Sequence, residues 1–290
     1  MVRQAKKRRT ALRRKRKRAR KQKRNAMSGG GKSESLRLHF SGYSLEPETK
    51  FLTNEKTMNA ILAAIEGGAP FIPRPIQRDE RTNVYYDTNG FRLYRLGFEC
   101  RGRKATDGNG YRHDLKTPDD PKDGQIGPDR EGNFLRREYN SVSQDMAPEL
   151  REFKTGGIDK ILEPIEDREL VPWVKGYFKR KRFTFSPTNF PDSKVEIAFE
   201  NGYYQTTNNR HTSEEMWIIE LELKEGRVEA LTSVAKALKD RYGLEVCPKT
   251  KGEMGLEFAR EFMDDEHQAK FDRSAAERLP RYSALRKEAE

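Results

Sequence analysis

The sequence is dominated by short segments in which charged and apolar residues alternate. Two of them, residues 46–51 (EPETKF) and 219–226 (IELELKEG), follow the order acid, acid, base on alternate positions: Glu46, Glu48 and Lys50, then Glu220, Glu222 and Lys224. Because successive side chains of a strand point to opposite faces, each set of three charges shares one face of a sheet. Both segments therefore predict strands with one charged face and one apolar face.

The same alternation recurs along much of the chain. Segments of this kind, mostly bounded by Gly, Pro, Asn or Asp, are residues 83–88, 93–104, 111–117, 134–142, 176–186, 194–206 and 215–224. One charged strand face is normally solvated, but many such strands with apolar opposite faces favour a sheet that curls around its polar side. Helical spacing is present at residues 54–66, 148–165, 227–241 and 254–271. We therefore predict an α+β fold, an antiparallel β-barrel with helices packed outside.

The net charge of +12 comes from the N-terminal segment. Residues 1–24 contain 15 Lys or Arg and no acid, whereas the rest of the chain has 43 basic and 46 acidic residues. Such a block buries too little apolar surface to fold, and it attracts polyanions such as nucleic acid, polyphosphate or an anionic membrane. We predict a disordered basic leader with a Gly/Ser linker over residues 1–35, a barrel over 36–256 and a charged helical extension over 257–290. In the alternative, translation starts at Met27 and the basic leader is absent.

The sequence favours a soluble protein in a reducing compartment. No apolar stretch follows the basic block, and no run of about 20 apolar residues suggests a transmembrane helix. Cys100 and Cys247 are too few for a disulfide framework. We therefore predict a cytoplasmic protein.

A closed barrel turns the charged face of the sheet into a lumen. Its basic residues are predicted to be Lys50, Arg101, Arg103, Lys116, Arg136, Arg180, Arg182 and Lys224, a set that suits a chain of phosphates. Its acidic residues are predicted to be Glu46, Glu48, Glu138, Glu220 and Glu222. These acids would repel a bare polyphosphate, so they fit only if Mg²⁺ or Mn²⁺ lies between carboxylate and phosphate oxygens. The predicted chemistry is metal-assisted attack on a phosphoanhydride.

The ordered series of motifs resembles one known family. EPETKF, YYDT, CRGR, DLKT, RREYN, FKRKR, VEIAFENG, IELELKEG and TKGEMG, within residues 43–256, are similar to those of the CYTH family, also called triphosphate tunnel metalloenzymes. The resemblance implies an eight-stranded antiparallel barrel that forms a tunnel. Members of the family include inorganic triphosphatases, thiamine triphosphatases and class IV adenylate cyclases, and related tunnel folds serve as RNA triphosphatases.

The resemblance also implies roles for individual residues. The implied catalytic residues are Lys50, Glu48 and Arg180; the implied metal ligands are Glu46, Glu48, Glu138, Glu220 and Glu222. The implied substrate-binding residues are Arg101, Arg103, Lys116 and Arg136, and we add Arg182 and Lys224 from the lumen set. The sequence departs from the family at Ile218 and Asn140, where acids are frequent, and this would weaken a second metal site.

We favour hydrolysis of the terminal phosphoanhydride of a short linear triphosphate, inorganic triphosphate before any nucleoside triphosphate, because no segment marks a base pocket. The alternatives are an adenylate cyclase or an RNA 5′-triphosphatase on the same scaffold, a non-catalytic polyphosphate or nucleotide sensor, and a nucleic-acid-binding protein. Outside the lumen set, we predict that Asp87 is a structural cap and that Cys100 faces the apolar layer.

Overall fold

The structure, a computed structural model, describes residues 39–40, 43–66, 76–105, 110–118, 133–153, 158, 162–165 and 168–287. The basic leader and linker predicted for residues 1–35 lie outside the described residues.

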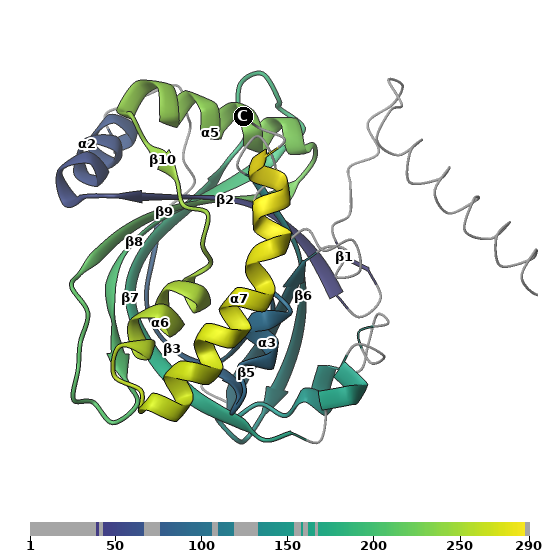
Figure 1. Ribbon diagram of the computed structural model, residues 1–290. Helices are drawn as coiled ribbons and strands as arrows, with labels where there is room; N and C mark the ends of the chain where they lie inside the picture. Colours follow the sequence, from purple (N-terminus) through teal and green to yellow (C-terminus); the bar gives the residue numbers. More distant parts are fainter. Residues whose placement is uncertain are drawn as a thin grey trace, which may run out of the picture. The chain divides into compact units, whose positions relative to one another are not determined.

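Eight antiparallel strands close into a barrel (Figure 1). They are β2 (Tyr43–Thr53), β3 (Gln77–Thr88), β4 (Glu99–Lys104), β5 (Tyr111–Pro118), β6 (Asn133–Ser143), β7 (Leu170–Phe185), β8 (Lys194–Thr206) and β9 (Met216–Glu225). Their order is β2-β6-β5-β4-β3-β7-β8-β9, and β9 pairs with β2 to close the barrel. Two short strands, β1 (His39–Phe40) and β10 (Glu245–Val246), also pair with β2. The predicted eight-stranded antiparallel barrel is confirmed.

The two acid-rich segments of the sequence become neighbours where the barrel closes. In the ladder between β2 and β9, Glu48 lies opposite Glu222 and Lys50 lies opposite Glu220. Like charges directly opposite each other destabilise a sheet, so the first of these pairs requires cations close by. A lumen rich in Lys and Arg supplies them, and this explains why acids and bases alternate along the same strands.

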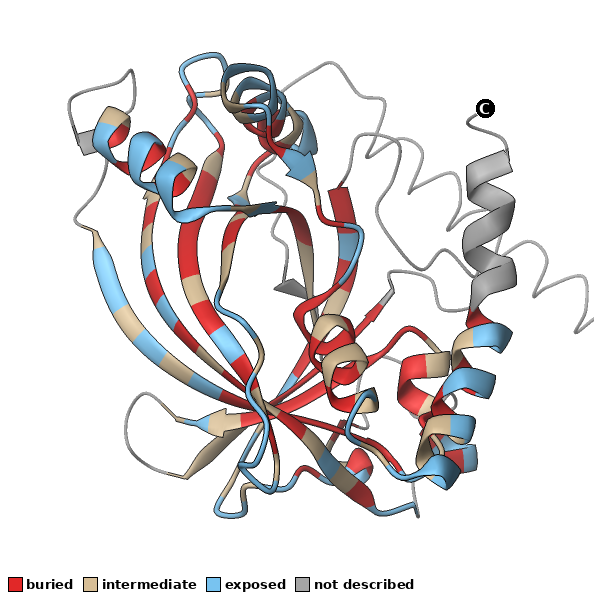
Figure 2. Cartoon of the chain, turned by 60° about the vertical axis from the view of Figure 1, so that its left-hand side comes forward, coloured by how far each residue is buried: buried red, intermediate tan, exposed pale blue. Residues whose placement is uncertain are grey.

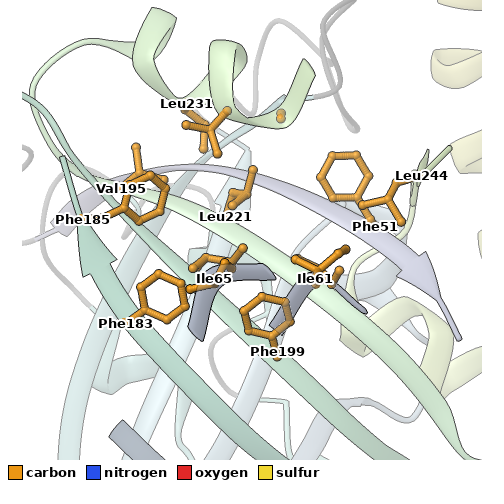
Figure 3. Close-up of a cluster of buried hydrophobic side chains, with 14 of the residues drawn as sticks. Phe51, Ile61, Ile65, Phe183, Phe185, Val195, Phe199, Leu221, Leu231 and Leu244 are labelled. Carbon is orange, nitrogen blue, oxygen red and sulfur yellow. The ribbon is translucent and has the colours of Figure 1, made fainter. Parts of the chain in front are cut away.

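Helices α2 (Glu55–Glu66) and α5 (Val228–Tyr242) cover the outer face of the barrel and confirm the helices predicted at 54–66 and 227–241. Figure 3 shows the apolar cluster beneath them, in which Phe183 and Phe199 of the barrel join Ile61 and Ile65 of α2 and Leu231 of α5. Because these side chains are buried beneath the helices, the apolar face of the strands points out of the barrel and the charged face points into it. Buried and more exposed residues alternate along parts of the barrel strands (Figure 2).

Two predicted elements are correct only in part. The described part of residues 148–165 contains two short 3₁₀ helices, Leu150–Phe153 and Glu163–Ile165, and a helical hydrogen bond from the backbone N–H of Leu162 to the carbonyl oxygen of Ile158 at 3.0 Å. Residues 154–157 and 159–161 lie outside the described residues. The apolar residues of the two 3₁₀ helices pack on the outside of the barrel, and apolar spacing of three to four residues also suits a segment that lies flat on a sheet. The strand predicted at 93–104 begins only at Glu99, because the short helix α3 (Arg92–Arg95) precedes it.

The helix predicted at 254–271 is divided into α6 (Lys251–Arg260) and α7 (Asp265–Lys287). Thr250 caps α6 in a reciprocal arrangement, in which its hydroxyl accepts from the backbone N–H of Glu253 and its own N–H donates to the Glu253 carboxylate. Asp264 accepts from the backbone N–H of His267 at 2.8 Å and starts α7. None of the described helices has both the length and the apolar character needed to cross a membrane.

Asp87 is the structural cap that the sequence predicts. Its carboxylate accepts hydrogen bonds from the backbone N–H groups of Thr88, Leu93 and Tyr94 at 2.6, 2.9 and 2.8 Å. These bonds hold α3 against the end of β3. Cys100 lies in the apolar cluster outside the barrel, as predicted.

Candidate active site

A cavity of about 150 Å³ inside the barrel is lined entirely by charged side chains. Its acids are Glu46, Glu48, Glu99, Glu138, Glu196, Glu220 and Glu222. Its bases are Lys50, Arg81, Arg101, Arg103, Arg112, Lys116, Arg136, Arg180, Arg182, Lys224 and Lys251. Eleven bases against seven acids leave a positive excess that favours an anionic ligand.

All thirteen site residues predicted from the sequence line this cavity, and their roles stay predictions. Five lining residues were not assigned to the site by sequence reasoning. Glu99, Arg112 and Glu196 alternate with apolar residues on predicted strands, so the same alternation could have included them. Arg81 was missed because β3 begins at residue 77, earlier than the predicted residue 83. Lys251 was missed because it comes from α6, whose position over the barrel is a tertiary feature.

The inner end of the cavity holds a buried group of ion pairs. The Nζ atom of Lys251 lies 2.6 Å from a carboxylate oxygen of Glu200 and 2.9 Å from one of Glu220. The Nζ atom of Lys50 lies 3.5 Å from Glu220. Burial lowers the pKa of Lys50, but the negative charges of Glu48 and Glu220 outweigh burial and raise it above its ordinary value. Lys50 therefore stays protonated.

Glu46, Glu138 and Glu222 form an acidic group around Lys116, whose Nζ atom lies 2.5 Å from Glu46. Burial would raise the pKa of Glu46, but the charge of Lys116 and a hydrogen bond with Glu138 hold it well below its usual range. Burial raises the pKa of Glu138 to about 8. The charge of Lys116 opposes this rise, whereas the hydrogen bond with Glu46 and the charge of Glu46 add to it. Burial and the charge of Glu46 also raise the pKa of Glu222. At neutral pH, Glu46 and Glu138 therefore share a proton that Glu138 carries.

The fully buried carboxylate of Asp114 holds three arginines. Its oxygens lie 2.8 Å from Nε of Arg101, 3.0 Å from Nη2 of Arg103 and 2.7 Å from Nε of Arg112. One carboxylate cannot satisfy every donor, and Nη1 of Arg103 and Nη2 of Arg136 are buried with no acceptor among the described residues. Burial and the charge of Arg101 lower the pKa of Arg103 to about 9, which reflects a shortage of negative charge around it. An anion in the cavity would supply both the charge and the acceptors.

Another part of the cavity wall is held by Glu196. Its two oxygens accept from Nη2 of Arg180 and Nη1 of Arg182, each at 3.0 Å. Lys224 lies 2.5 Å from Glu222 and 3.8 Å from Glu196. These bonds fix two arginines from β7 toward the cavity.

The two departures from the family pattern have structural consequences. Ile218 is fully buried in an apolar cluster, so the row of acids on β9 ends at Glu220. The side-chain oxygen of Asn140 accepts from Nη2 of Arg112 at 2.7 Å. Asn140 therefore orients an arginine without adding negative charge.

The described residues contain no group of three His, Cys, Asp or Glu side chains already arranged to hold a metal ion. Glu46 and Glu138 still fit a hard divalent cation, because two carboxylates that share a proton can exchange that proton for Mg²⁺ or Mn²⁺. The raised pKa of Glu222 beside Glu46 has the same cause and favours the same exchange. Glu220 is instead paired with Lys50 and Lys251, so metal binding there would require a lysine to move.

The pKa of Glu138 predicts how the stability of the ligand-free protein depends on pH. A carboxyl whose pKa is higher in the folded than in the unfolded state stabilises the fold at low pH, and this contribution disappears as pH rises through the folded value. We therefore expect the melting temperature to fall as pH increases from about 4.5 to about 8 and to level off above that range. Glu138→Gln, which keeps a neutral hydrogen-bonding side chain, should make this fall smaller. If the melting temperatures of the wild type and of Glu138→Gln depend on pH in the same way, Glu138 does not carry a proton shared with Glu46.

The fold and the site define a closed barrel with a charged lumen, and comparisons with solved structures give barrels of the same kind. A protein described as a "putative adenylate cyclase" from Bacillus halodurans matches over 72% of this chain and 96% of its own, with 16% identity and a TM-score of 0.44. HpAC1 from Hippeastrum, described as having a dominant triphosphatase activity, matches over 73% of this chain and 93% of its own, with 12% identity and a TM-score of 0.44. The Pct1 RNA triphosphatase of S. pombe matches over 78% and 83%, with 12% identity and a TM-score of 0.25.

These neighbours are described as adenylate cyclases or triphosphatases. No family model and no curated protein matches the chain. At these identities the barrel assignment depends on the chain's own strand pairing, and activity is a separate question.

Proposed function

We propose that this protein is a divalent-metal-dependent phosphohydrolase that cleaves the terminal phosphoanhydride of a short linear triphosphate, with inorganic triphosphate preferred. The observation that carries the proposal is the pair of buried, unsatisfied N–H donors on Arg103 and Arg136 inside a cavity with excess positive charge. Buried guanidinium donors without acceptors are costly, and phosphate oxygens satisfy them well.

The lining also supports the preference for inorganic triphosphate. Every lining side chain is charged, and none is aromatic or aliphatic. A nucleobase is normally held against apolar or aromatic surface, which this cavity does not offer among its described lining residues. A ligand made of phosphate oxygens matches the cavity better.

The proposed roles follow from position in the cavity. Arg103 and Arg136 bind phosphate oxygens, while Arg180 stabilises negative charge that develops on the transferred group. Lys50 and Glu48 hold the attacking water at the inner end. The remaining predicted substrate-binding residues, Arg101, Lys116, Arg182 and Lys224, keep the acids in place and add positive charge.

The proposed metal ligands are Glu46, Glu138 and Glu222, with Glu48 and Glu220 as the further ligands that the family resemblance implies. A bound Mg²⁺ or Mn²⁺ would neutralise phosphate charge and lower the pKa of a bound water. The shared proton of Glu46 and Glu138 must leave before this set can bind a cation.

A single screen tests the proposal. Phosphate release is measured from inorganic triphosphate, ATP, thiamine triphosphate and RNA with a 5′-triphosphate, each with Mg²⁺, with Mn²⁺ and with chelator. We expect release from inorganic triphosphate to be fastest and chelator to abolish it. Formation of cyclic AMP from ATP, or faster release from RNA, would favour the cyclase or the RNA triphosphatase. Release of no phosphate from any substrate with either metal would reject the enzyme.

One observation favours a sensor as the second candidate. The acids that line the cavity already have basic partners, and no group of three among the described residues is arranged to hold a metal. A sensor would bind triphosphate in the same screen without turnover. Removal of residues 1–26 distinguishes the enzyme from a nucleic-acid-binding protein. The enzyme should keep its turnover without these residues, whereas a nucleic-acid-binding protein should lose its function.

A further inference from the structure

Part of the outer face of the barrel lies beyond the covering helices. Figure 1 shows α2 and α5 over one end of the barrel, whereas β7 and β8 extend beyond them. Arg180 and Arg182 of β7 line the charged cavity, so Lys179 and Lys181, which alternate with them, point out of the barrel. Both lysines are exposed. This outer face is therefore separate from the lumen to which the proposed hydrolysis is assigned.

Three cations of this face, Arg78, Lys179 and Lys181, have no acidic partner. Arg78 of β3 lies directly opposite Lys181 of β7, and like charges in this position destabilise a sheet. None of the three cations forms an ion pair with another described residue. The exposed Glu80 lies opposite Lys179 and balances at most one of the three charges. An anion bound outside the barrel would relieve this repulsion.

A pocket of about 380 Å³ lies beside these cations, and all three of them line it. Leu62 of α2, Phe199 of β8 and Trp217 of β9 give it an apolar and aromatic wall. Asp79 also lines the pocket, but its carboxylate already accepts from Nη2 of Arg81 at 2.9 Å. The volume is that of a small-molecule site. The pocket thus joins positive charge to the surface for a nucleobase that the charged cavity lacks.

Two tyrosines continue the aromatic surface along the sheet. Tyr177 of β7 lies opposite Tyr203 of β8, and their stacked rings have centroids 5.3 Å apart. Tyr203 is 37% exposed, so part of its ring is open to a ligand. Asn201, which lines the pocket, precedes Tyr203 by two residues and shares its face of β8. The outward-facing residues of β7 follow one another about every 6.7 Å in the order Lys175, Tyr177, Lys179 and Lys181.

Aromatic rings among cations suit a single-stranded nucleic acid. Its bases stack on aromatic side chains, and its phosphates pair with Lys and Arg. A duplex keeps its bases stacked on one another, so it offers phosphates but leaves the rings unused. An anionic membrane favours exposed aliphatic side chains, and the described part of this face has none. An acidic peptide supplies charge without planar groups for the rings.

We propose that this outer face binds single-stranded nucleic acid. The residues that form the site are Arg78, Tyr177, Lys179, Lys181, Tyr203 and Trp217. One base fills the pocket beside Trp217, another stacks on Tyr203, and the three cations hold the phosphates. These contacts reach base faces and phosphates, so binding depends on neither base sequence nor sugar. The inference goes beyond the proposed function, because the site lies outside the lumen and breaks no bond.

Tryptophan fluorescence locates the bound strand. The chain has two tryptophans, and Trp173 packs on Phe91 with ring centroids 4.5 Å apart instead of lining the pocket. In Trp173→Phe all tryptophan emission therefore comes from Trp217, and in Trp217→Phe it comes from Trp173. A single-stranded RNA or DNA of about 12 nucleotides with a 5′-hydroxyl end should quench the first variant and leave the second unchanged. No quenching in Trp173→Phe, or equal quenching by the duplex, would overturn the site.

Two sets of variants separate charge from stacking. Fluorescence anisotropy of a labelled oligonucleotide measures the affinity of the full chain at several salt concentrations. Lys179→Gln with Lys181→Gln should make the slope of log affinity against log salt less steep by about 1.4, since each phosphate contact with a single strand contributes about 0.7. Tyr203→Leu should weaken single-strand binding about tenfold and leave both the salt slope and duplex binding unchanged.

The matched controls carry the same changes elsewhere on the molecule. Lys104→Gln with Lys239→Gln removes two exposed charges from β4 and α5, and Tyr111→Leu removes a half-buried ring from β5. The basic residues 1–24 are the same in every variant, so a difference between variants reports on the face. The controls should bind like the wild type. Equal losses in the controls and in the face variants would assign binding to overall charge and overturn the proposal.

Competition distinguishes this face from the charged cavity. Saturating inorganic triphosphate, added with chelator at constant ionic strength, should leave the oligonucleotide affinity unchanged, whether or not the protein hydrolyses triphosphate. Displacement of the strand would place it in the cavity and overturn the proposal. Vesicles of phosphatidylserine form the last arm. If Lys179→Gln with Lys181→Gln loses vesicle binding but keeps oligonucleotide binding, the face is a membrane surface instead.

Discussion

Replacing Glu48 with glutamine is expected to lower triphosphate turnover by about 100-fold or more and to leave triphosphate affinity within about threefold. Glu48 lies 3.8 Å from Nη1 of Arg136 and 3.9 Å from Nζ of Lys116. Glutamine keeps the size of the side chain but removes its charge, so the cavity becomes more positive and still holds an anion. The reaction loses a carboxylate that can hold a divalent cation or orient water. Steady-state phosphate release measures turnover, and calorimetry measures affinity.

The matched control is Glu80→Gln. Glu80 is an exposed residue of the same barrel, outside the charged cavity, so its replacement should change neither quantity. Normal turnover in Glu48→Gln would remove Glu48 from the catalytic residues. Loss of both turnover and binding would instead identify Glu48 as a residue that holds Arg136 and Lys116 in place.

Replacing Arg103 with methionine is expected to weaken triphosphate binding by about 10- to 100-fold, the value of a charge-assisted hydrogen bond to phosphate. The same variant should leave the melting temperature of the ligand-free protein unchanged or raise it. Arg103 is a buried cation with an unsatisfied N–H group and a pKa lowered to about 9 by burial and by Arg101. Its removal leaves Asp114 paired with Arg101 and Arg112. Functional residues held at such a cost to stability are common in binding sites.

Arg78→Met is the control for Arg103→Met, because Arg78 is an exposed residue of β3 outside the charged cavity. It should bind triphosphate normally. A large loss of melting temperature in Arg103→Met would show that Arg103 serves the fold, and unchanged triphosphate affinity would show that it does not contact the ligand.

Residue periodicity located the strands because each one buries one face and exposes the other to the lumen. At residues 148–165 it predicted one helix, whereas the described part begins and ends in short 3₁₀ helices whose apolar side chains pack on the barrel. It also missed the break between α6 and α7, because a capping residue such as Asp264 can occur inside a stretch that keeps its apolar period. In both cases the local pattern is compatible with two structures, and tertiary packing selects one of them.

The order of charged and apolar residues was enough to predict 13 of the 18 side chains that line the cavity, since strand alternation fixes the face on which each side chain lies. The tertiary structure alone decided how those charges act on one another. The pKa of Glu138 depends on its burial and on Glu46, which lies on a different strand, and the donors of Arg103 lack acceptors because three arginines converge on Asp114. The place of Lys251 in the cavity likewise depends on a tertiary contact, the hydrogen bond from the Tyr204 hydroxyl to the carbonyl oxygen of Lys251 in the first turn of α6. Electrostatic energies and packing vary steeply with distance, and distances between residues far apart in sequence are set only when the barrel closes.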